Sequence, residues 1–403
     1  MLPYTRETRP AFNEIEVQLP APYEASLSER TRTHLITSSW VEPAQSGRIR
    51  GFDGLRAIAF LLVFASHKIN FQQADSIGDV GVWLFFVLSG FLITRILARS
   101  RIDIESGAST IRSGLANFYL KRTSRIFPPY YLLLGSAAAL HLYLTIDNFR
   151  STERLTYFLF GTNILIATHG YWPGDFGHFW SLAVEEQFYL LFAPFVLFVP
   201  RKNTIGVCVA IIAVSLMTKI TMEDLGSSPL AIDVNSFVNF GLLAFGGIIG
   251  LTASVPPCSW LCSGTAQLFM LGFYLSLPTA FGTYPVWPVL GKASAILAGI
   301  LLLQIFTGQK TWFVAVLESA PLRKIGRASY GAYLIHHFIH FETIGHALDH
   351  LGVEIDATAS LKTLTELAMT LALAALSWRY FESPIISLAA RSVPQALTRR
   401  RPH

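Results

Sequence analysis

The sequence predicts an all-α fold, a polytopic membrane bundle of about ten transmembrane helices. Hydrophobic residues make up 52% of the 403 residues and charged residues only 14%, whereas soluble domains carry roughly 25% charged residues. The apolar residues are also gathered into stretches of about 20 residues, the length that crosses about 30 Å of hydrocarbon. Secreted, fibrous and disordered classes are therefore excluded. The formal net charge of +5 then reports on membrane topology rather than on nucleic-acid binding.

Ten apolar stretches are long enough to serve as membrane spans. They are 52–71, 80–98, 127–145, 179–199, 204–220, 236–253, 260–281, 286–306, 330–348 and 361–381. A further stretch, 155–168, is shorter and is interrupted by Gly161, Thr162 and Asn163. We expect it to be re-entrant or interfacial, because irregular backbone at membrane depth is tolerated only where it lines a cavity or is buried in protein.

The basic residues predict the orientation of the bundle. The connection from Arg95 to Arg125 carries six arginines and one lysine, so the positive-inside rule makes it cytoplasmic. With ten spans, both termini then lie on the cytoplasmic side of the cell inner membrane. In residues 1–50 six arginines are balanced by six glutamates, and we expect a poorly ordered cytoplasmic tail. Residues 385–403 are predicted to form a basic cytoplasmic C-terminal tail.

The first span contains three ionisable residues, which are costly in a membrane and are therefore functional candidates. Arg56 and His67 are eleven residues apart, so an α-helix places them on one face, separated by about 16 Å along its axis. Asp53 is expected to cap this helix and to pair with Arg56, and Lys68 to anchor it at the outer interface. An arginine that reaches lipid headgroups and a histidine bonded to a carbonyl are the simpler alternatives.

Two further segments supply charged candidates. Arg122 and Arg125 share a helix face just before the third span, and their planar guanidinium groups suit bidentate phosphate binding. A purely topological role for these charges is the alternative. In the fourth span, Glu185 and Glu186 point about 100° apart, so only one of them can face a given cavity squarely. An ion pair that locks the helix is the competing interpretation of this carboxylate pair.

A metal centre is not expected. His336 and His340 have the spacing of some zinc ligands on a helix, but no carboxylate or cysteine accompanies them at a matching spacing. Cys258 and Cys262 also lack further ligands nearby. Three cysteines in the whole chain cannot form a disulfide framework either.

Six strings in the sequence together resemble the acyltransferase 3 family of integral-membrane acyltransferases. They are GFDGLRAIAFLLVFASH with its Arg-x10-His pair, GVWLFFVLSGFLIT, RTSRIFPPYY, HFWSLAVEEQFYLL, IGRASYGAYLIH and WRYFESP. Each string alone is weak, but their order along residues 51–384 makes the resemblance specific. It implies that residues 51–384 form a membrane domain that transfers an acyl group, usually acetyl, from cytoplasmic acyl-CoA to a hydroxyl of a glycan or small molecule.

The resemblance also implies roles for individual residues. Arg56 and His67 match the essential Arg-x10-His pair, and Arg122 and Arg125 match a segment implicated in CoA binding. Since Arg56 is expected on the same side of the membrane, all three arginines are predicted to bind acetyl-CoA or another acyl-CoA. His67 is predicted to act as general base or acyl carrier. Glu186, in preference to Glu185, is predicted to orient its imidazole.

We therefore hypothesise a membrane O-acetyltransferase that modifies a glycan, either a cell-surface polysaccharide or an exopolysaccharide, in contact with the lipid bilayer and without nucleic acid. A transporter of polysaccharide, lipid or protons is the competing class, because it would use the same buried polar residues. A membrane sensor or scaffold is the third, and it would not need Arg56 or His67.

Overall fold

The computed structural model describes residues 48–70, 72–144, 153–253, 259–283, 291–342 and 358–392, so the expected N-terminal tail lies almost entirely outside the described residues. Within these ranges all regular structure is helical, which confirms the predicted all-α class. The main helices are α2 (Phe52–Lys68), α3 (Ala74–Glu105), α4 (Ile111–Leu144), α5 (Arg154–Phe158), α6 (Thr162–His169), α7 (Phe179–Phe198), α8 (Thr204–Asp224), α9 (Pro229–Asp233), α10 (Ser236–Thr252), α11 (Gly264–Phe281), α13 (Ala295–Thr307), α14 (Trp312–Leu317), α15 (Ala320–Ile335), α17 (Ala359–Ser377) and α18 (Ser383–Ser392).

The number of membrane spans is not confirmed as ten. In the described part of the chain, five helical segments are long and apolar enough to cross a membrane: Ala74–Glu105, Gly174–Phe198, Arg201–Asp224, Pro229–Thr252 and Ala359–Arg391. The expected third span lies in α4, which has 34 residues but is not among these five segments. Some other expected spans are shorter helices. Helix α2 has 17 residues and contains Arg56, His67 and Lys68, and α13 has 13 residues. The expected ninth span, 330–348, is wrong in its bounds, because α15 begins at Ala320 and ends at Ile335.

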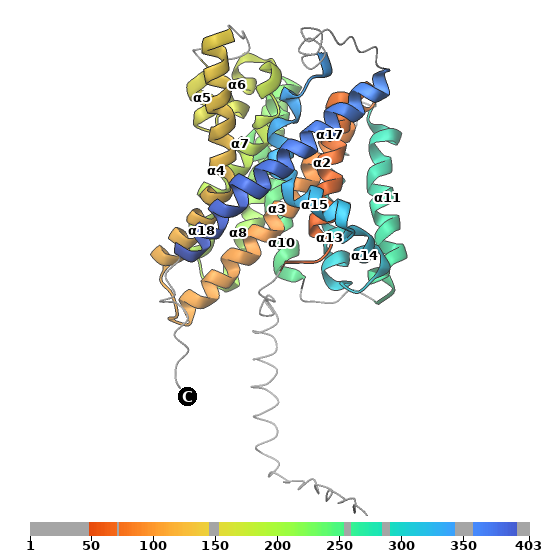
Figure 1. Cartoon of the computed structure of the whole chain (residues 1–403). Coiled ribbons are helices and arrows are strands. Elements are labelled where there is room, and N and C mark those ends of the chain that lie inside the picture. The colour runs from red at the N-terminus through yellow and green to blue at the C-terminus, as the bar shows by residue number, and fades with distance from the viewer. Residues whose placement is uncertain are drawn as a thin grey trace, which may run out of the picture.

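Helix α3 forms the centre of the bundle (Figure 1). Helices α2 and α10 pack along it, and α7, α11 and α13 also contact it. The crossing of α3 with α10 is close because Gly90 lies against the backbone of Leu243, where a Cβ would come within 1.8 Å of the carbonyl oxygen. Small residues permit such close approach of membrane helices, where van der Waals packing replaces the hydrophobic effect as the main attraction.

Helix α15 also packs against α2. Its backbone at Gly326 lies directly against the backbone of Asp53. This contact brings the later turns of α15 beside the span from Arg56 to His67. A 3-10 turn, His336–Phe338, follows α15 immediately.

The interrupted stretch 155–168 forms two short helices, α5 and α6, each well below the length of a membrane span. The break between them is held by a polar network on α7, in which the Gln187 amide donates to the carbonyl of Phe160 (2.9 Å) and to the side-chain oxygen of Asn163 (3.0 Å). Asn163 in turn donates to the Ser236 hydroxyl (2.8 Å). The irregular backbone is thus supported by protein, as expected for non-helical structure at membrane depth.

The basic connection between α3 and α4 is shorter than the sequence predicts. Both helices extend past the length that hydrocarbon requires, so only residues 106–110 join them, at the lower end of the bundle in Figure 1. Arg95, expected in this connection, is buried in α3, where it donates to the carbonyl of Gly250 (2.9 Å) and lies over the ring of Phe306. At the C-terminal end, residues up to Ser392 continue as α18, which packs against α4.

Candidate active site

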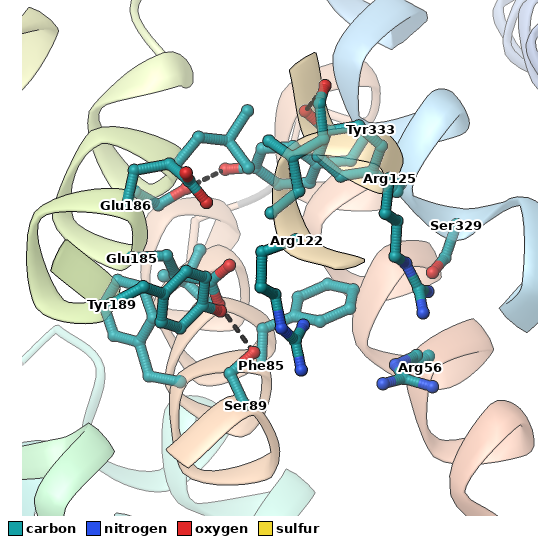
Figure 2. Close-up of a pocket in the computed structure, with 16 residues that line it drawn as sticks. Arg56, Phe85, Ser89, Arg122, Arg125, Glu185, Glu186, Tyr189, Ser329 and Tyr333 are labelled. Atoms are coloured by element: carbon teal, nitrogen blue, oxygen red, sulfur yellow. Dashed lines mark hydrogen bonds between the residues drawn. The ribbon is translucent and has the colours of Figure 1, made fainter. Parts of the chain in front are cut away.

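A pocket of about 760 Å³, its open mouth included, lies between α2, α3, α4, α7 and α15. Its lining residues are Arg56, Val82, Phe85, Phe86, Ser89, Arg122, Arg125, Ile126, Ser181, Leu182, Glu185, Glu186, Tyr189, Ser329, Tyr330 and Tyr333. All three arginines expected to bind the donor are among them. Figure 2 shows their guanidinium groups directed into the same space from two different helices. We call this space the arginine pocket.

The arginines of the pocket are incompletely neutralised. Arg56 pairs with Asp53 (3.3 Å), as expected, but Asp53 also pairs with Arg48 (3.0 Å). Arg122 lies over the ring of Tyr189, with 5.4 Å from the guanidinium carbon to the ring centroid. Neither Arg122 nor Arg125 forms an ion pair with a carboxylate among the residues that the structure describes. The pocket therefore presents guanidinium donors suited to a polyanion.

Asp53 does not cap α2, contrary to expectation. The cap position is Gly51, which has no side-chain acceptor and adopts a left-handed conformation with φ 86°. The backbone N–H of Gly51 donates instead to the carboxylate of Glu318 (2.7 Å). Asp53 lies in the first turn of α2, where it pairs with Arg48, Arg56 and Arg327.

The two adjacent glutamates both line the arginine pocket. The Glu185 carboxylate accepts a hydrogen bond from the Ser89 hydroxyl (2.8 Å) (Figure 2). Oε1 of Glu186 is buried and accepts no hydrogen bond from the described residues. His67 does not line this pocket, and the expected hydrogen bond between Glu186 and His67 is not formed. The catalytic role of Glu186 stays a prediction, and His67 is hydrogen-bonded to a different residue.

The hydrogen-bonding partner of His67 is His336. Nδ1 of His67 lies 2.9 Å from Nε2 of His336. The ring of His337 meets His67 edge-on at 4.3 Å between centroids, and His178 stacks on His337 at 4.7 Å. These four residues, His67, His178, His336 and His337, form the histidine cluster. One nitrogen each from His67, His336 and His337 lie within 4.8 Å of one another.

The histidine pair considered for metal binding in the sequence is not formed. Because α15 ends at Ile335, His336 and His340 do not share a helix face. His340 pairs with Asp175 instead (3.2 Å), while His336 is fully buried in the histidine cluster. Cys262 has no disulfide partner, and Cys258 lies outside the described residues.

The side chains of Ser181 and Tyr333 separate the arginine pocket from the histidine cluster. The hydroxyls of Ser181 and Tyr333 are hydrogen-bonded to each other at 2.6 Å, and both residues line the pocket. The same Tyr333 hydroxyl donates to the carbonyl of His178 (3.0 Å), and the Tyr333 ring lies 5.6 Å from that of His336. One layer of side chains therefore separates the two parts of the site.

Lys68 is not an interfacial anchor. Its side chain is only 8% exposed and pairs with Glu366 at 3.3 Å. It also donates to the carbonyl of Ile339 (2.6 Å). This buried pair fastens the last turn of α2, which carries His67, to α17 and to the segment after the histidine cluster.

The sequence did not give Tyr333 or Ser181 a role in the site, and it considered His336 only as a metal ligand together with His340. Tyr333 and His336 belong to the string IGRASYGAYLIH, and Ser181 belongs to HFWSLAVEEQFYLL. Both strings were recognised as family features without a chemical role for these residues. The available signal was the presence of polar groups within otherwise apolar motifs.

Comparison with known proteins identifies the class of this membrane bundle. The family model described as an acyltransferase domain matches residues 49–379, and the chain belongs to this acyltransferase 3 family. Similar proteins include peptidoglycan O-acetyltransferase OatA of Listeria monocytogenes, 27% identical over 360 residues that cover 84% of this chain and 56% of that protein. O-acetyltransferase OatA of Staphylococcus aureus is 26% identical over 356 residues, covering 83% and 57% respectively. The chain thus spans little more than half the length of these relatives. No solved structure matches it.

Proposed function

We propose that the chain is a membrane O-acetyltransferase that moves an acetyl group from cytoplasmic acyl-CoA to a hydroxyl of a glycan. The observation that carries this proposal is the convergence of Arg56, Arg122 and Arg125 on one pocket, next to a histidine cluster that contains His67. Family membership and the names of the relatives support the reaction class.

The arginine pocket is suited to the donor. The phosphates of CoA need several fixed cationic donors, and guanidinium forks bind phosphate oxygens in pairs. Among the described residues, neither Arg122 nor Arg125 is held in an ion pair that the donor would have to break. Glu185 and Glu186 also line the pocket, and when either is ionised it lowers the net positive charge there and so favours release of the product.

His67 is suited to the transfer step. It lies eleven residues, or about 16 Å, beyond Arg56 along α2, so the extended arm of a donor held by the arginines would bring its thioester toward the histidine cluster. Nε2 of His67 takes the proton of the acceptor hydroxyl as the oxygen attacks the thioester carbonyl carbon. The carbon–sulfur bond then breaks, and the departing thiolate takes that proton from His67. An ester and free CoA result.

The acceptor is proposed to be a glycan at the outer side of the cell inner membrane. The relatives are named for O-acetylation, one of them of peptidoglycan. The basic residues around the α3–α4 connection support a cytoplasmic position for that end of the bundle, with both termini on the same side. His67 is exposed at the opposite end of α2, where an extracytoplasmic hydroxyl can reach it.

The test is acetyl transfer by the purified chain in lipid vesicles. We expect release of CoA thiol from acetyl-CoA that depends on added peptidoglycan or polysaccharide fragments, with the acetyl label recovered on the glycan. His67→Ala should abolish both signals while the protein still inserts into the vesicles. Glycan movement across the vesicle membrane without thiol release would instead establish the transporter class.

A further inference from the structure

The orientation of the His67 ring is set by a chain of two hydrogen bonds. Nδ1 of His336 lies 2.7 Å from the carbonyl oxygen of Tyr333. A carbonyl oxygen can only accept, so Nδ1 of His336 carries a hydrogen. The ring is fully buried, it contacts the rings of His178 and His337, and no carboxylate among the described residues is hydrogen-bonded to it. A buried imidazole in such surroundings is neutral, which leaves Nε2 of His336 as a hydrogen-bond acceptor.

The acceptor on His336 determines where the hydrogen of His67 lies. Nδ1 of His67 is 2.9 Å from Nε2 of His336, so it is the donor of that hydrogen bond. A neutral imidazole carries one hydrogen, and Nε2 of His67 therefore holds a free lone pair. This is the tautomer that a general base requires, with its basic nitrogen directed away from His336.

We propose that His336 is a positioning residue that fixes the tautomer and ring orientation of His67, in the place that a carboxylate occupies in a serine-hydrolase triad. This inference rests on the proposed function, because it assigns a partner to the base named there. When Nε2 of His67 takes the acceptor proton, Nδ1–H keeps its hydrogen bond to His336. The positive charge formed on His67 thus retains a buried acceptor.

The surroundings of His336 permit a substitution that removes its hydrogen-bond acceptor and keeps its aromatic packing. Its ring contacts the rings of Phe60 and Phe64, at 6.2 and 6.4 Å between centroids. A phenylalanine fits this aromatic environment but has no acceptor for His67. Glutamine, in contrast, carries an acceptor oxygen at a reach similar to that of Nε2. His340 supplies a matched control, because it lies in the same segment but pairs with Asp175 and not with His67.

The experiment measures acetyl-CoA-dependent glycan acetylation in vesicles by wild type, His67→Ala, His336→Phe, His336→Gln and His340→Gln. We expect His336→Phe to lower kcat about 100-fold with little change in KM for acetyl-CoA, since loss of the correct tautomer affects only the chemical step. His336→Gln should recover kcat to within about tenfold of wild type, and His340→Gln should match wild type. A merely structural role would change KM and thermal stability along with kcat.

Three results would overturn the inference. If His67→Ala is inactive but His336→Phe retains full kcat, His336 does not position the base, although the proposed function stands. If His67→Ala is fully active, the proposed role of His67 fails as well. If the purified protein contains a stoichiometric transition metal that is lost in His336→Phe, Nε2 of His336 is a metal ligand and cannot accept from His67.

Discussion

Gly326 of α15 and Asp53 of α2 are in direct backbone contact, so that a Cβ added at Gly326 would lie 1.7 Å from the Asp53 carbonyl oxygen. This is one of the closest helix contacts in the described structure. It sets the position of Tyr333 relative to Arg56, and that of His336 relative to His67. The alignment of the candidate site therefore depends on residue 326 being a glycine, which has no side chain to hold the two helices apart.

We expect Gly326→Ala to destabilise the protein by about 3 kcal/mol or more, because two packed backbones must separate to admit the methyl group. Gly206→Ala is the matched control, since no atom lies within 4 Å of its added Cβ in α8. Thermal unfolding in detergent measures both. An unfolding temperature for Gly326→Ala equal to that of wild type would contradict the close contact.

Replacing Arg122 and Arg125 together by glutamine should raise KM for acetyl-CoA by about tenfold or more and leave kcat nearly unchanged, because both guanidinium groups are proposed to bind donor phosphates. Lys121→Gln is the control, since Lys121 is exposed on the same helix and does not line the pocket. The donor dependence of initial rates in vesicles gives both constants. If KM stays constant, the arginine pocket does not bind the donor.

Glu186→Gln separates the two roles considered for this residue. Because Glu186 lines the arginine pocket and does not contact His67, we expect the neutral amide to change KM for acetyl-CoA severalfold and kcat by less than about threefold. The measurement is the same steady-state assay. A loss of kcat of about 100-fold at constant KM would restore the original prediction that Glu186 acts on the catalytic histidine.

Lys68→Met should destabilise the protein by about 3 kcal/mol, because it leaves the buried carboxylate of Glu366 without its cation. Adding Glu366→Gln should recover most of this loss, since the charge is removed while an acceptor remains for the backbone N–H of Phe341, which now donates to Glu366 at 2.7 Å. Unfolding of the single and double variants in detergent tests the pair. Additive losses would show that Lys68 and Glu366 are not coupled.

The fold class could be predicted from the sequence because apolar stretches of membrane length leave few alternatives to a helical bundle. The three arginines of the arginine pocket could also be predicted from the sequence, since Arg56 and the Arg122–Arg125 pair lie in recognisable motifs. The residues at which the helices begin and end could not be predicted as well from the sequence. Apolar length marks the part of a helix that lies in lipid, whereas α3 and α4 continue beyond it.

The histidine cluster could not be predicted from spacing. His67 and His336 are 269 positions apart, and they meet only because α15 ends at Ile335 and turns. The sequence instead suggested a continuous helix through this point, which would have joined His336 to His340. The Lys68–Glu366 pair could not be predicted for the same reason, since the pairing of buried charges far apart in the sequence depends on packing and not on local pattern.

The bonded hydroxyls of Tyr333 and Ser181 have a consequence for the membrane as an electrical insulator. They stand between the arginine pocket and the histidine cluster. Because this partition is only one layer of side chains thick, an acetyl group held on one side of it is close to the residues on the other side. Under the proposed transfer only the acetyl group would cross this partition, so the reaction itself would need no continuous aqueous path through the bundle, and a membrane that holds an ion gradient would keep it.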